Sequence, residues 1–390
     1  MSVAPGVPLL DLKAQYAQLK PELDAALARV VESQYFILGE EVDALERELG
    51  EYLGVPHAIG CASGSDAILL ALMALDLGRG DEVLCPTYTF FATAGYVVRA
   101  GAKPVFADID PVTYNLDPVS AREAAGRAAK LKALLPVHLY GQCADLAALE
   151  ALAASRGVPL IEDAAQAIGS RDAKGRSAGA VGALGCFSFF PTKNLGGFGD
   201  GGLVTTADAG LAEKLRVLRV HGSKPKYYHH VVGVNSRLDA LQAAVLRVKL
   251  KYLEAWHAAR ARNAAAYDRR FKAAGARSSA EPLEGGGFPL RFPHAPAAPA
   301  RHIYNQYVIR VPAERRDALR ASLTERRIGT EIYYPVPLHL QQCFAGLGYK
   351  EGRFPQAERA ARETLALPIY PELSAAQIEQ VATAIVEFLK

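Results

Sequence analysis

The chain has 390 residues, of which 50% are hydrophobic and 22% charged, and its formal net charge is +3. This composition excludes an intrinsically disordered chain, and the length suggests one large domain with a smaller one attached. Because 44 basic residues balance 41 acidic ones without a long basic run, we expect no nucleic-acid partner.

The cysteines and the apolar runs indicate the cellular setting. The cysteines are odd in number and scattered, so they predict reduced thiols rather than disulfides or a metal site. No apolar run reaches the roughly 18 residues that span a membrane, and the start of the chain does not look like a signal peptide. We therefore expect a cytoplasmic protein without a membrane partner. The cysteines are Cys61, Cys85, Cys143, Cys186 and Cys343.

Helical spacing of apolar residues comes first along the chain, over residues 21–31 and again through Val42 and Leu49, ending near Gly54. Short apolar runs bounded by Gly, Pro or Asp then alternate with helical stretches such as 67–75 and 146–154. The alternation predicts an α/β fold with a mainly parallel sheet, in a large domain over about residues 56–245. The predicted strands are 58–60, 82–85, 104–109, 133–139, 158–162, 185–190 and 202–205.

The last third of the chain predicts a smaller α+β domain. Residues 238–272 read as one long helix, with Trp256 on its buried side, and 275–300 as a loop. A strand at 307–311, a helix at 313–326 and a last helix from Ala375 follow. Ser374 and Gln377 form the capping box of that last helix. We expect a division between 1–245, holding the N-terminal segment and large domain, and 246–390, holding the connecting helix and small domain.

Four places follow predicted strands or precede the long helix, where a ligand of an open α/β sheet is expected. Residues 61–66, Cys-Ala-Ser-Gly-Ser-Asp, suit a phosphate held at a helix N-terminus. Their other interpretation is a tight turn capped by Ser65. Asp163 ends a strand and suits a protonated ring nitrogen, or else caps a helix.

The other two places carry a lysine and a polar motif. Lys193 lies between a Phe-rich strand and a glycine-dense loop, and a lysine in an apolar pocket can form a Schiff base with a carbonyl. Residues 235–239, Asn-Ser-Arg-Leu-Asp, precede the long helix and have cap residues as their other interpretation. Together, the phosphate turn, the carboxylate and the lysine predict a pyridoxal phosphate site.

Specific motifs lie along almost the whole chain. They include Ser63-Gly-Ser-Asp-Ala67, Pro136-Val-His-Leu-Tyr-Gly141, Glu162-Asp-Ala-Ala-Gln166, Thr192-Lys-Asn194 and Asn235-Ser-Arg-Leu-Asp239. In these motifs the sequence resembles the DegT/StrS family of nucleotide-sugar aminotransferases. The resemblance implies fold type I, the aspartate aminotransferase-like fold, with a mixed, mainly parallel sheet in the large domain and a smaller C-terminal α+β domain.

The resemblance implies pyridoxal 5′-phosphate as cofactor, with pyridoxamine 5′-phosphate formed during turnover. Lys193 would bind the cofactor covalently and transfer protons, and Asp163 would pair with the pyridine nitrogen. Gln166 would lie near the ring oxygen and Phe90 would stack on the ring. The phosphate would be held by Ser65 and Ser188, by Gly64 and Asp66 mainly through their backbone, and by Asn235 of a second copy in a homodimer with shared sites.

Substrate residues are also implied by the resemblance. The basic and aromatic segment with Lys226, Tyr227 and Tyr228 suits a pyrophosphate and a sugar, or else is an exposed polar loop. Tyr334 and His339 match the family's His-Tyr-Pro…His segment, although Tyr333 stands where the family has the first His. We expect all five side chains to contact substrate, and no metal ion to take part.

The resemblance is strongest to enzymes that aminate C3 of a dTDP-3-keto-6-deoxyhexose, with L-glutamate as amino donor. UDP-linked 3-keto-sugars are the alternative substrates. Three other functions are open at this point: a pyridoxamine-dependent sugar dehydratase, which has His in place of the lysine; a regulatory protein that keeps the fold without catalysis; and a lyase or aldolase acting on amino acids.

Overall fold

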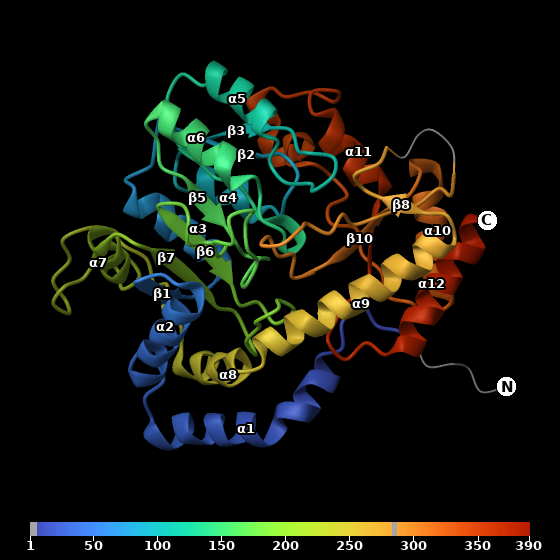
Figure 1. Ribbon diagram of the computed structural model, residues 1–390. Coiled ribbons are helices and arrows are strands. Elements are labelled where there is room, and N and C mark those ends of the chain that lie inside the picture. Colours follow the sequence, from blue (N-terminus) through green and yellow to red (C-terminus); the bar gives the residue numbers. More distant parts are fainter. Residues whose placement is uncertain (1–5, 283–286) are drawn as a thin grey trace.

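The computed structural model describes residues 6–282 and 287–390. At its centre, strands in the order β1-β7-β6-β5 continue into β4-β2-β3, because parallel bridges pair Leu134 with Leu160 and Val137 with Asp163 (Figure 1). β7 runs antiparallel to both its neighbours, and the other strand pairs are parallel. The predicted mixed, mainly parallel sheet is confirmed. Its strands are β1 (His57–Cys61), β2 (Glu82–Pro86), β3 (Lys103–Ala107), β4 (Leu131–Leu134), β5 (Ile161–Asp163), β6 (Leu184–Ser188) and β7 (Gly202–Thr206).

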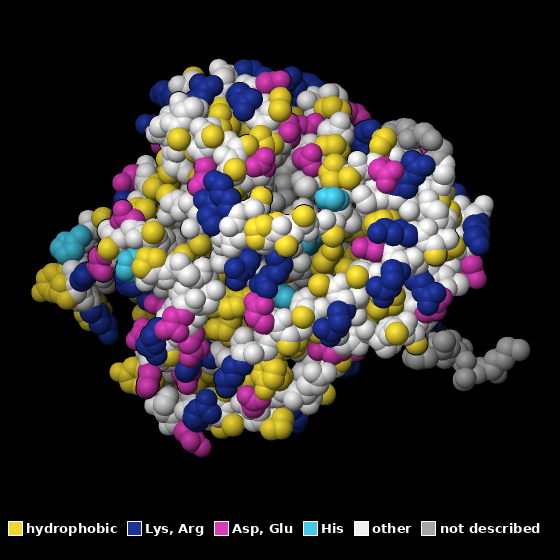
Figure 2. Space-filling view, in the orientation of Figure 1, with side chains coloured by type: hydrophobic (Ala, Val, Ile, Leu, Met, Phe, Trp, Pro, Cys, Tyr) yellow, Lys and Arg dark blue, Asp and Glu magenta, His cyan; other side chains and the backbone are white. Residues whose placement is uncertain are grey.

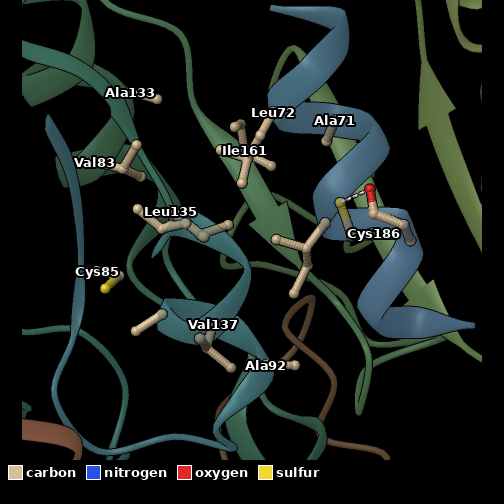
Figure 3. Packing of buried hydrophobic residues seen from close by; sticks show 14 of the residues in the cluster. Ala71, Leu72, Val83, Cys85, Ala92, Ala133, Leu135, Val137, Ile161 and Cys186 are labelled. Atoms are coloured by element: carbon tan, nitrogen blue, oxygen red, sulfur yellow. Dashed lines mark hydrogen bonds between the residues drawn. The ribbon is translucent and has the colours of Figure 1, made fainter. Parts of the chain in front are cut away.

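Helices cover this sheet and bury its apolar side chains, which is the main driving force for the layered arrangement. Figure 3 shows one packing face, where side chains of β2, β5 and β6 meet the helix that follows β1. There the Cys186 thiol donates to the carbonyl of Ala67 at 3.4 Å. The helices are α3 (Gly64–Ala74), α4 (Ala92–Arg99), α5 (Pro118–Arg127), α6 (Leu146–Arg156) and α7 (Ala209–Leu218), with the short η1 (Leu139–Gly141) before α6.

The N-terminal helices are α1 (Leu12–Ser33) and α2 (Glu40–Leu53). α1 begins nine residues before the predicted start at 21, because the Asp11 side chain accepts hydrogen bonds from the backbone N–H groups of Lys13 and Ala14. The predicted end of α2 is confirmed, since Gly54 adopts a left-handed conformation (φ 73°) that suits glycine.

The predicted long helix over 238–272 is wrong in one respect. It is two helices, α8 (Ala240–Leu250) and α9 (Leu253–Ala273), broken between Lys251 and Tyr252. The break leaves the apolar spacing almost undisturbed, so the sequence pattern continues across it. Trp256 is buried as predicted. α9 crosses the molecule and leads to the C-terminal elements (Figure 1).

The C-terminal elements form a second sheet in the order β11-β10-β9-β8 with helices on it. The predicted loop over 275–300 holds two short strands, and its residues 283–286 lie outside the described part. The capping box of Ser374 and Gln377 is confirmed. The elements are β8 (Arg277–Ser278), β9 (Arg291–Phe292), β10 (Tyr307–Arg310), α10 (Ala313–Glu325), η2 (Leu338–Leu340), η3 (Gln342–Leu347), α11 (Pro355–Glu363), β11 (Thr364–Leu367) and α12 (Ala375–Leu389).

The two sheets share parts of their cores. Phe344 and Phe354 of the C-terminal part pack into the core of the large sheet, whereas Val7 packs among the residues of α9 and α12. The division at residue 245 stays a prediction. Within residues 6–282 and 287–390, no helix has both the length and the apolar character of a membrane span. The same residues hold no group of three or more His, Cys, Asp or Glu side chains placed to bind a metal ion.

Candidate active site

Asp163 and Lys193 meet at the carboxyl edge of the large sheet. Asp163 is the last residue of β5, and Lys193 follows the parallel neighbour β6. Lys193 is partly exposed as a residue, but its amine lies deep: burial lowers the pKa of Lys193 to about 8, against the attraction of the Asp163 carboxylate. Burial likewise raises the pKa of Asp163. A carboxylate and a lysine of altered pKa at a ligand-binding edge are typical of a catalytic site.

The Asp163 side chain is oriented by groups that the sequence analysis missed. Thr93 Oγ1 donates to Asp163 Oδ2 at 2.8 Å, and Thr89 Oγ1 lies 3.1 Å from Thr93 Oγ1. The backbone N–H of Ala165 donates to Asp163 Oδ1 at 3.2 Å. No helix follows Asp163, so its alternative as a helix cap is wrong. The only signal in the sequence was the spacing of two threonines four residues apart at a helix start.

The predicted phosphate turn is the N-terminus of α3. Its cap is Ser63, whose side chain accepts from the N–H of Asp66, so the alternative with Ser65 as cap is wrong. Gly64 lies so close to Ser188 that an added Cβ would come within 2.5 Å of the Ser188 Cβ. The structure thus brings Gly64, Ser65 and Asp66 beside Ser188, where the free N–H groups of the first helical turn favour an anion.

Gln166, Tyr334 and Phe90 close the site on its other side. Gln166 Nε2 donates to Tyr334 Oη at 3.1 Å, and its Oε1 accepts from the N–H of Tyr140 at 2.7 Å. The Phe90 ring lies 6.1 Å from the Tyr334 ring and is 55% exposed, so its face is open to a ligand. These three predicted residues therefore come together from β2, β5 and the C-terminal part.

The segment that carries Tyr334 is held by two consecutive residues that follow β2. The Tyr88 hydroxyl donates to the carbonyl of Tyr333 at 2.6 Å and accepts from the N–H of Tyr334 at 2.9 Å. Four residues on, the Thr87 carbonyl accepts from the N–H of Leu338 at 2.7 Å. Thr87 and Tyr88 thus join the C-terminal segment to the strand that leads to Phe90.

His339 does not reach the site. Its ring is buried, with Nδ1 2.8 Å from Thr87 Oγ1 and Nε2 3.0 Å from Glu358 Oε1. Both ring nitrogens are therefore engaged within the protein. The sequence analysis expected His339 to contact the substrate directly, but neither nitrogen is free to do so. The side chain instead anchors the segment that carries Tyr334.

The remaining predicted residues are exposed side chains of the 220–235 segment. Lys226, Tyr227 and Tyr228 are exposed, Tyr227 by 79%, on a projecting segment beyond α7. Figure 2 shows hydrophobic and histidine side chains gathered on the projection at the left of the view. Asn235 is exposed and pairs through its backbone with Val220. Within the described part of one chain, no hydrogen bond or ion pair joins these four side chains to Lys193 or Asp163, although the neighbouring Ser236 accepts from the N–H of Ala62 beside the phosphate turn.

The sequence model of the DegT/DnrJ/EryC1/StrS aminotransferase family matches residues 17–386. The chain belongs to this family. Among curated proteins, it is 52% identical to a pleiotropic regulatory protein of Geobacillus stearothermophilus, over 98% of this chain and 99% of the other. It is 45% identical to a UDP-N-acetyl-3-dehydro-α-D-glucosamine 3-aminotransferase of Acidithiobacillus ferrooxidans, with 97% of each chain covered. It is 44% identical to the dTDP-3-amino-3,4,6-trideoxy-α-D-glucose transaminase of Streptomyces venezuelae, with 98% and 96% covered.

Solved structures agree with the family and its cofactor. DesV of S. venezuelae, solved in complex with a ketimine intermediate, superposes with a TM-score of 0.92 at 43% identity, with 99% of each chain covered. NtdA of Bacillus subtilis, solved with bound pyridoxamine phosphate, gives 0.87 at 28% identity, with 100% and 86% covered. This DegT/DnrJ/EryC1/StrS protein is therefore a pyridoxal phosphate-dependent sugar aminotransferase with the fold-type I architecture.

The residues of the site fit that cofactor. The buried amine of Lys193 matches the aldehyde of the cofactor, and the Asp163 carboxylate at the end of a strand matches its ring nitrogen. The helix N-terminus beside Ser188 matches its phosphate. The small Gly64 leaves room where any side chain would strike Ser188. When bound, pyridoxal phosphate supplies an electron sink for charge that develops at the amino carbon of the substrate.

The lowered pKa of Lys193 predicts how the apoprotein takes up its cofactor. Only the neutral amine attacks an aldehyde, so the attachment rate should rise with pH to about 8 and then level off. An ordinary lysine would keep gaining rate toward its usual pKa of about 10.4. Stopped-flow absorbance against pH measures the midpoint. Asp163→Asn, which removes the opposing charge, should move the midpoint lower, and a rate still rising at pH 10 would contradict the assignment.

Tyr88→Phe should weaken sugar binding more than catalysis. The change leaves the N–H of Tyr334 without its acceptor, while the carbonyl of Tyr333 keeps the hydrogen bond that the Tyr140 hydroxyl donates. An N–H left without an acceptor costs about 1–3 kcal/mol, so the KM for keto-sugar should rise about tenfold with little change in kcat. Tyr349→Phe is the matched control, because its hydroxyl accepts from the N–H of Phe106 away from Tyr334. Equal KM values in both variants would show that Tyr88 does not position the sugar site.

Proposed function

We propose that this aminotransferase moves an amino group from L-glutamate to C3 of a nucleotide-linked 3-keto-sugar, with Lys193 and Asp163 as its catalytic residues. The observation that carries the proposal is the buried pair at the sheet edge. Lys193 has a lowered pKa of about 8, and Asp163 is fixed by Thr93 and the N–H of Ala165. No other described lysine faces a carboxylate at the carboxyl edge of the large sheet in this way.

Each half of the reaction uses the same side chains. Lys193 would act as the base that removes a proton from the α-carbon of the donor and as the acid that returns a proton to the aminated carbon of the sugar. Asp163 would pair with the ring nitrogen of the cofactor and favour its protonated form. Gln166 and Phe90 would hold the plane of the ring. The Ser65 and Ser188 side chains and the N–H groups of Gly64 and Ser65 would hold the phosphate, whereas the N–H of Asp66 already donates to the Ser63 side chain.

The sugar is proposed to be a dTDP-3-keto-6-deoxyhexose, with a UDP-linked 3-keto-sugar as the alternative. The names of both sugar-acting relatives place the amino group at position 3. Identity to the dTDP-sugar enzyme (44%) and to the UDP-sugar enzyme (45%) does not separate the two nucleotides. The dTDP choice follows the resemblance of the sequence to enzymes that aminate C3 of a dTDP-3-keto-6-deoxyhexose. Tyr334, beside Gln166, is the proposed contact of this chain to the sugar.

The active site is proposed to be shared between two copies of the chain. The side chains of Asn235, Lys226, Tyr227 and Tyr228 are exposed, as expected for residues that serve a partner. Exposed aromatic side chains, Tyr35 and Phe198 among them, offer an apolar surface for such a contact.

If Asn235 acts across the interface, mixing inactive Lys193→Ala and Asn235→Asp chains should restore about a quarter of wild-type activity through hybrid dimers. Mixtures that stay inactive while forming hybrids would place Asn235 in its own site.

The test follows the cofactor and then the sugar. Protein loaded with pyridoxal phosphate should change to the pyridoxamine spectrum on addition of L-glutamate and release 2-oxoglutarate. The pyridoxamine form is then offered a dTDP-3-keto-6-deoxyhexose and a UDP-3-keto-sugar separately, with mass spectrometry of the products. Amination of the UDP-sugar alone favours the alternative.

A regulatory function is the second candidate, because a relative 52% identical to this chain bears the name pleiotropic regulatory protein. Loaded protein that ignores every amino donor would favour that candidate. Turnover of a keto-sugar by catalytic amounts of protein would leave regulation without support as the primary function.

A further inference from the structure

A small cavity lies next to the residue that precedes Lys193. Its volume is about 70 Å³, and its lining comes from the N-terminal segment, α9, the 305–306 segment and β11. The polar lining residues are Thr192, Arg260, Asn305, Gln306 and Tyr333. A cavity of this size holds a carboxylate group with a few carbon atoms and is far too small for a nucleotide-sugar.

Arg260 brings a buried positive charge to this cavity. The residue is only 4% exposed, and its Nη1 donates to the carbonyls of Tyr304 at 3.0 Å and Ile369 at 2.8 Å. Within residues 6–282 and 287–390, no carboxylate lies within ion-pair distance of its guanidinium, and its Nε and Nη2 have no hydrogen-bond acceptor. A buried charge without a counter-ion is costly, and an anionic ligand would relieve that cost.

Asn305 also lines the cavity, but its buried Oδ1, which has no partner in the described part of the chain, is an acceptor, so the affinity for a carboxylate comes from Arg260. Burial also lowers the pKa of Arg260 to about 10, with Glu372 too distant to form an ion pair. At neutral pH the guanidinium is still charged, so the cavity presents free N–H donors that match a carboxylate.

We infer that Arg260 binds a carboxylate of the amino donor, which holds glutamate with its amino group directed to the Lys193 side of Thr192. This inference rests on the proposed aminotransferase function and gives the donor its binding residue. The 2-oxoglutarate that leaves carries the same carboxylates and occupies the same cavity. The proposed dTDP-3-keto-6-deoxyhexose has no carboxylate and gains nothing from Arg260.

Two variants separate this role from folding. Arg260→Gln removes the charge, and Gln306→Glu places a competing carboxylate in the cavity while leaving the Arg260 bonds to Tyr304 and Ile369 intact. Gln306 Oε1 accepts from Asn305 Nδ2 at 2.7 Å, and a glutamate keeps that acceptor. The matched control is Arg262→Gln, an exposed arginine two residues along the same helix.

The experiment measures each half-reaction and ligand binding on loaded protein. Both variants should raise the glutamate concentration for half-maximal conversion about 10- to 100-fold, the effect of losing a charge-assisted hydrogen bond. Amination of a dTDP-3-keto-6-deoxyhexose by the pyridoxamine form should change less than about threefold, since this sugar carries no carboxylate for Arg260 to bind. 2-Oxoglutarate should raise the Tm of the wild type and of Arg262→Gln but not that of the two variants.

Each outcome has a separate meaning. Unchanged glutamate dependence in folded Arg260→Gln, or in Gln306→Glu if the first variant does not fold, overturns the Arg260 assignment. An equal loss in both half-reactions also overturns it, because it indicates a structural role. A wild type that no amino donor converts refutes the proposed function instead, and it does so before either variant is made.

Discussion

Lys193→Ala is expected to lower turnover by at least about a thousandfold, the combined loss of covalent attachment and proton transfer. The variant retains the phosphate turn, Asp163 and Gln166, so it should still bind pyridoxal phosphate without linking to it. The measurements are single-turnover kinetics with glutamate and the absorbance of the bound cofactor. We expect a spectrum close to that of the free aldehyde and no conversion on the time scale of the wild type.

Lys249 provides a control inside the same molecule. Burial also lowers its pKa to about 8, and its Nζ donates to the carbonyl of Gly196 at 2.7 Å. If a low pKa alone made a lysine reactive, pyridoxal phosphate would attach to both Lys193 and Lys249. If the surrounding site is also needed, the cofactor attaches to Lys193 alone. Borohydride reduction of the loaded protein followed by peptide mapping should place the cofactor on Lys193 only. Label on Lys249, or turnover by Lys193→Ala near the wild-type rate, would refute the catalytic assignment.

The strand ends and the glycine-rich turns were predictable because their signals are local. Asp163, Ser188 and Lys193 each follow an apolar run, and parallel strands bring their carboxyl ends to one edge. Gly64 and its neighbours were predicted by residue size and by their place before a helix. These predictions need only the alternation of strands and helices, which is the main sequence pattern of residues 56–245.

What the sequence did not disclose depends on long-range contacts. Thr93 reaches Asp163 across 70 residues, and Tyr88 reaches Tyr333 across 245. His339 matched a motif, yet its ring hydrogen-bonds Thr87 and Glu358 instead of facing the site. A motif gives the type of a residue but not the direction in which its side chain points. Arg260 was not singled out, because it is one of several charged residues along the predicted long helix. Such contacts are set by how elements pack, which no local spacing records.

Neighbouring carboxylates on β5 allow a final prediction, because successive side chains of a strand point to opposite faces. Glu162 accepts from the N–H groups of Gly179, Val181 and Gly182 and lies 2.7 Å from the His138 ring. Burial opposes its ionisation, but these hydrogen bonds hold its pKa below the usual value. Asp163 faces Lys193 instead. One strand therefore carries a structural carboxylate and a catalytic one side by side.

Asp163→Asn and Glu162→Gln should therefore fail in opposite ways. Asp163→Asn keeps the shape but loses the charge that holds the ring nitrogen protonated, so kcat should fall by about a hundredfold or more with little change in Tm. Glu162→Gln should cost about 3 kcal/mol of stability at neutral pH, since it breaks a buried hydrogen-bonded charge. The pKa of Glu162 is lower in the folded state than in the unfolded state, so its ionised form stabilises the fold at pH values above the unfolded-state pKa. The difference in stability between the wild type and Glu162→Gln should therefore shrink as the pH falls through the folded-state pKa of Glu162. Thermal melts against pH and single-turnover rates on both variants test this, and a Glu162→Gln protein that keeps its Tm but loses kcat would reverse the two roles.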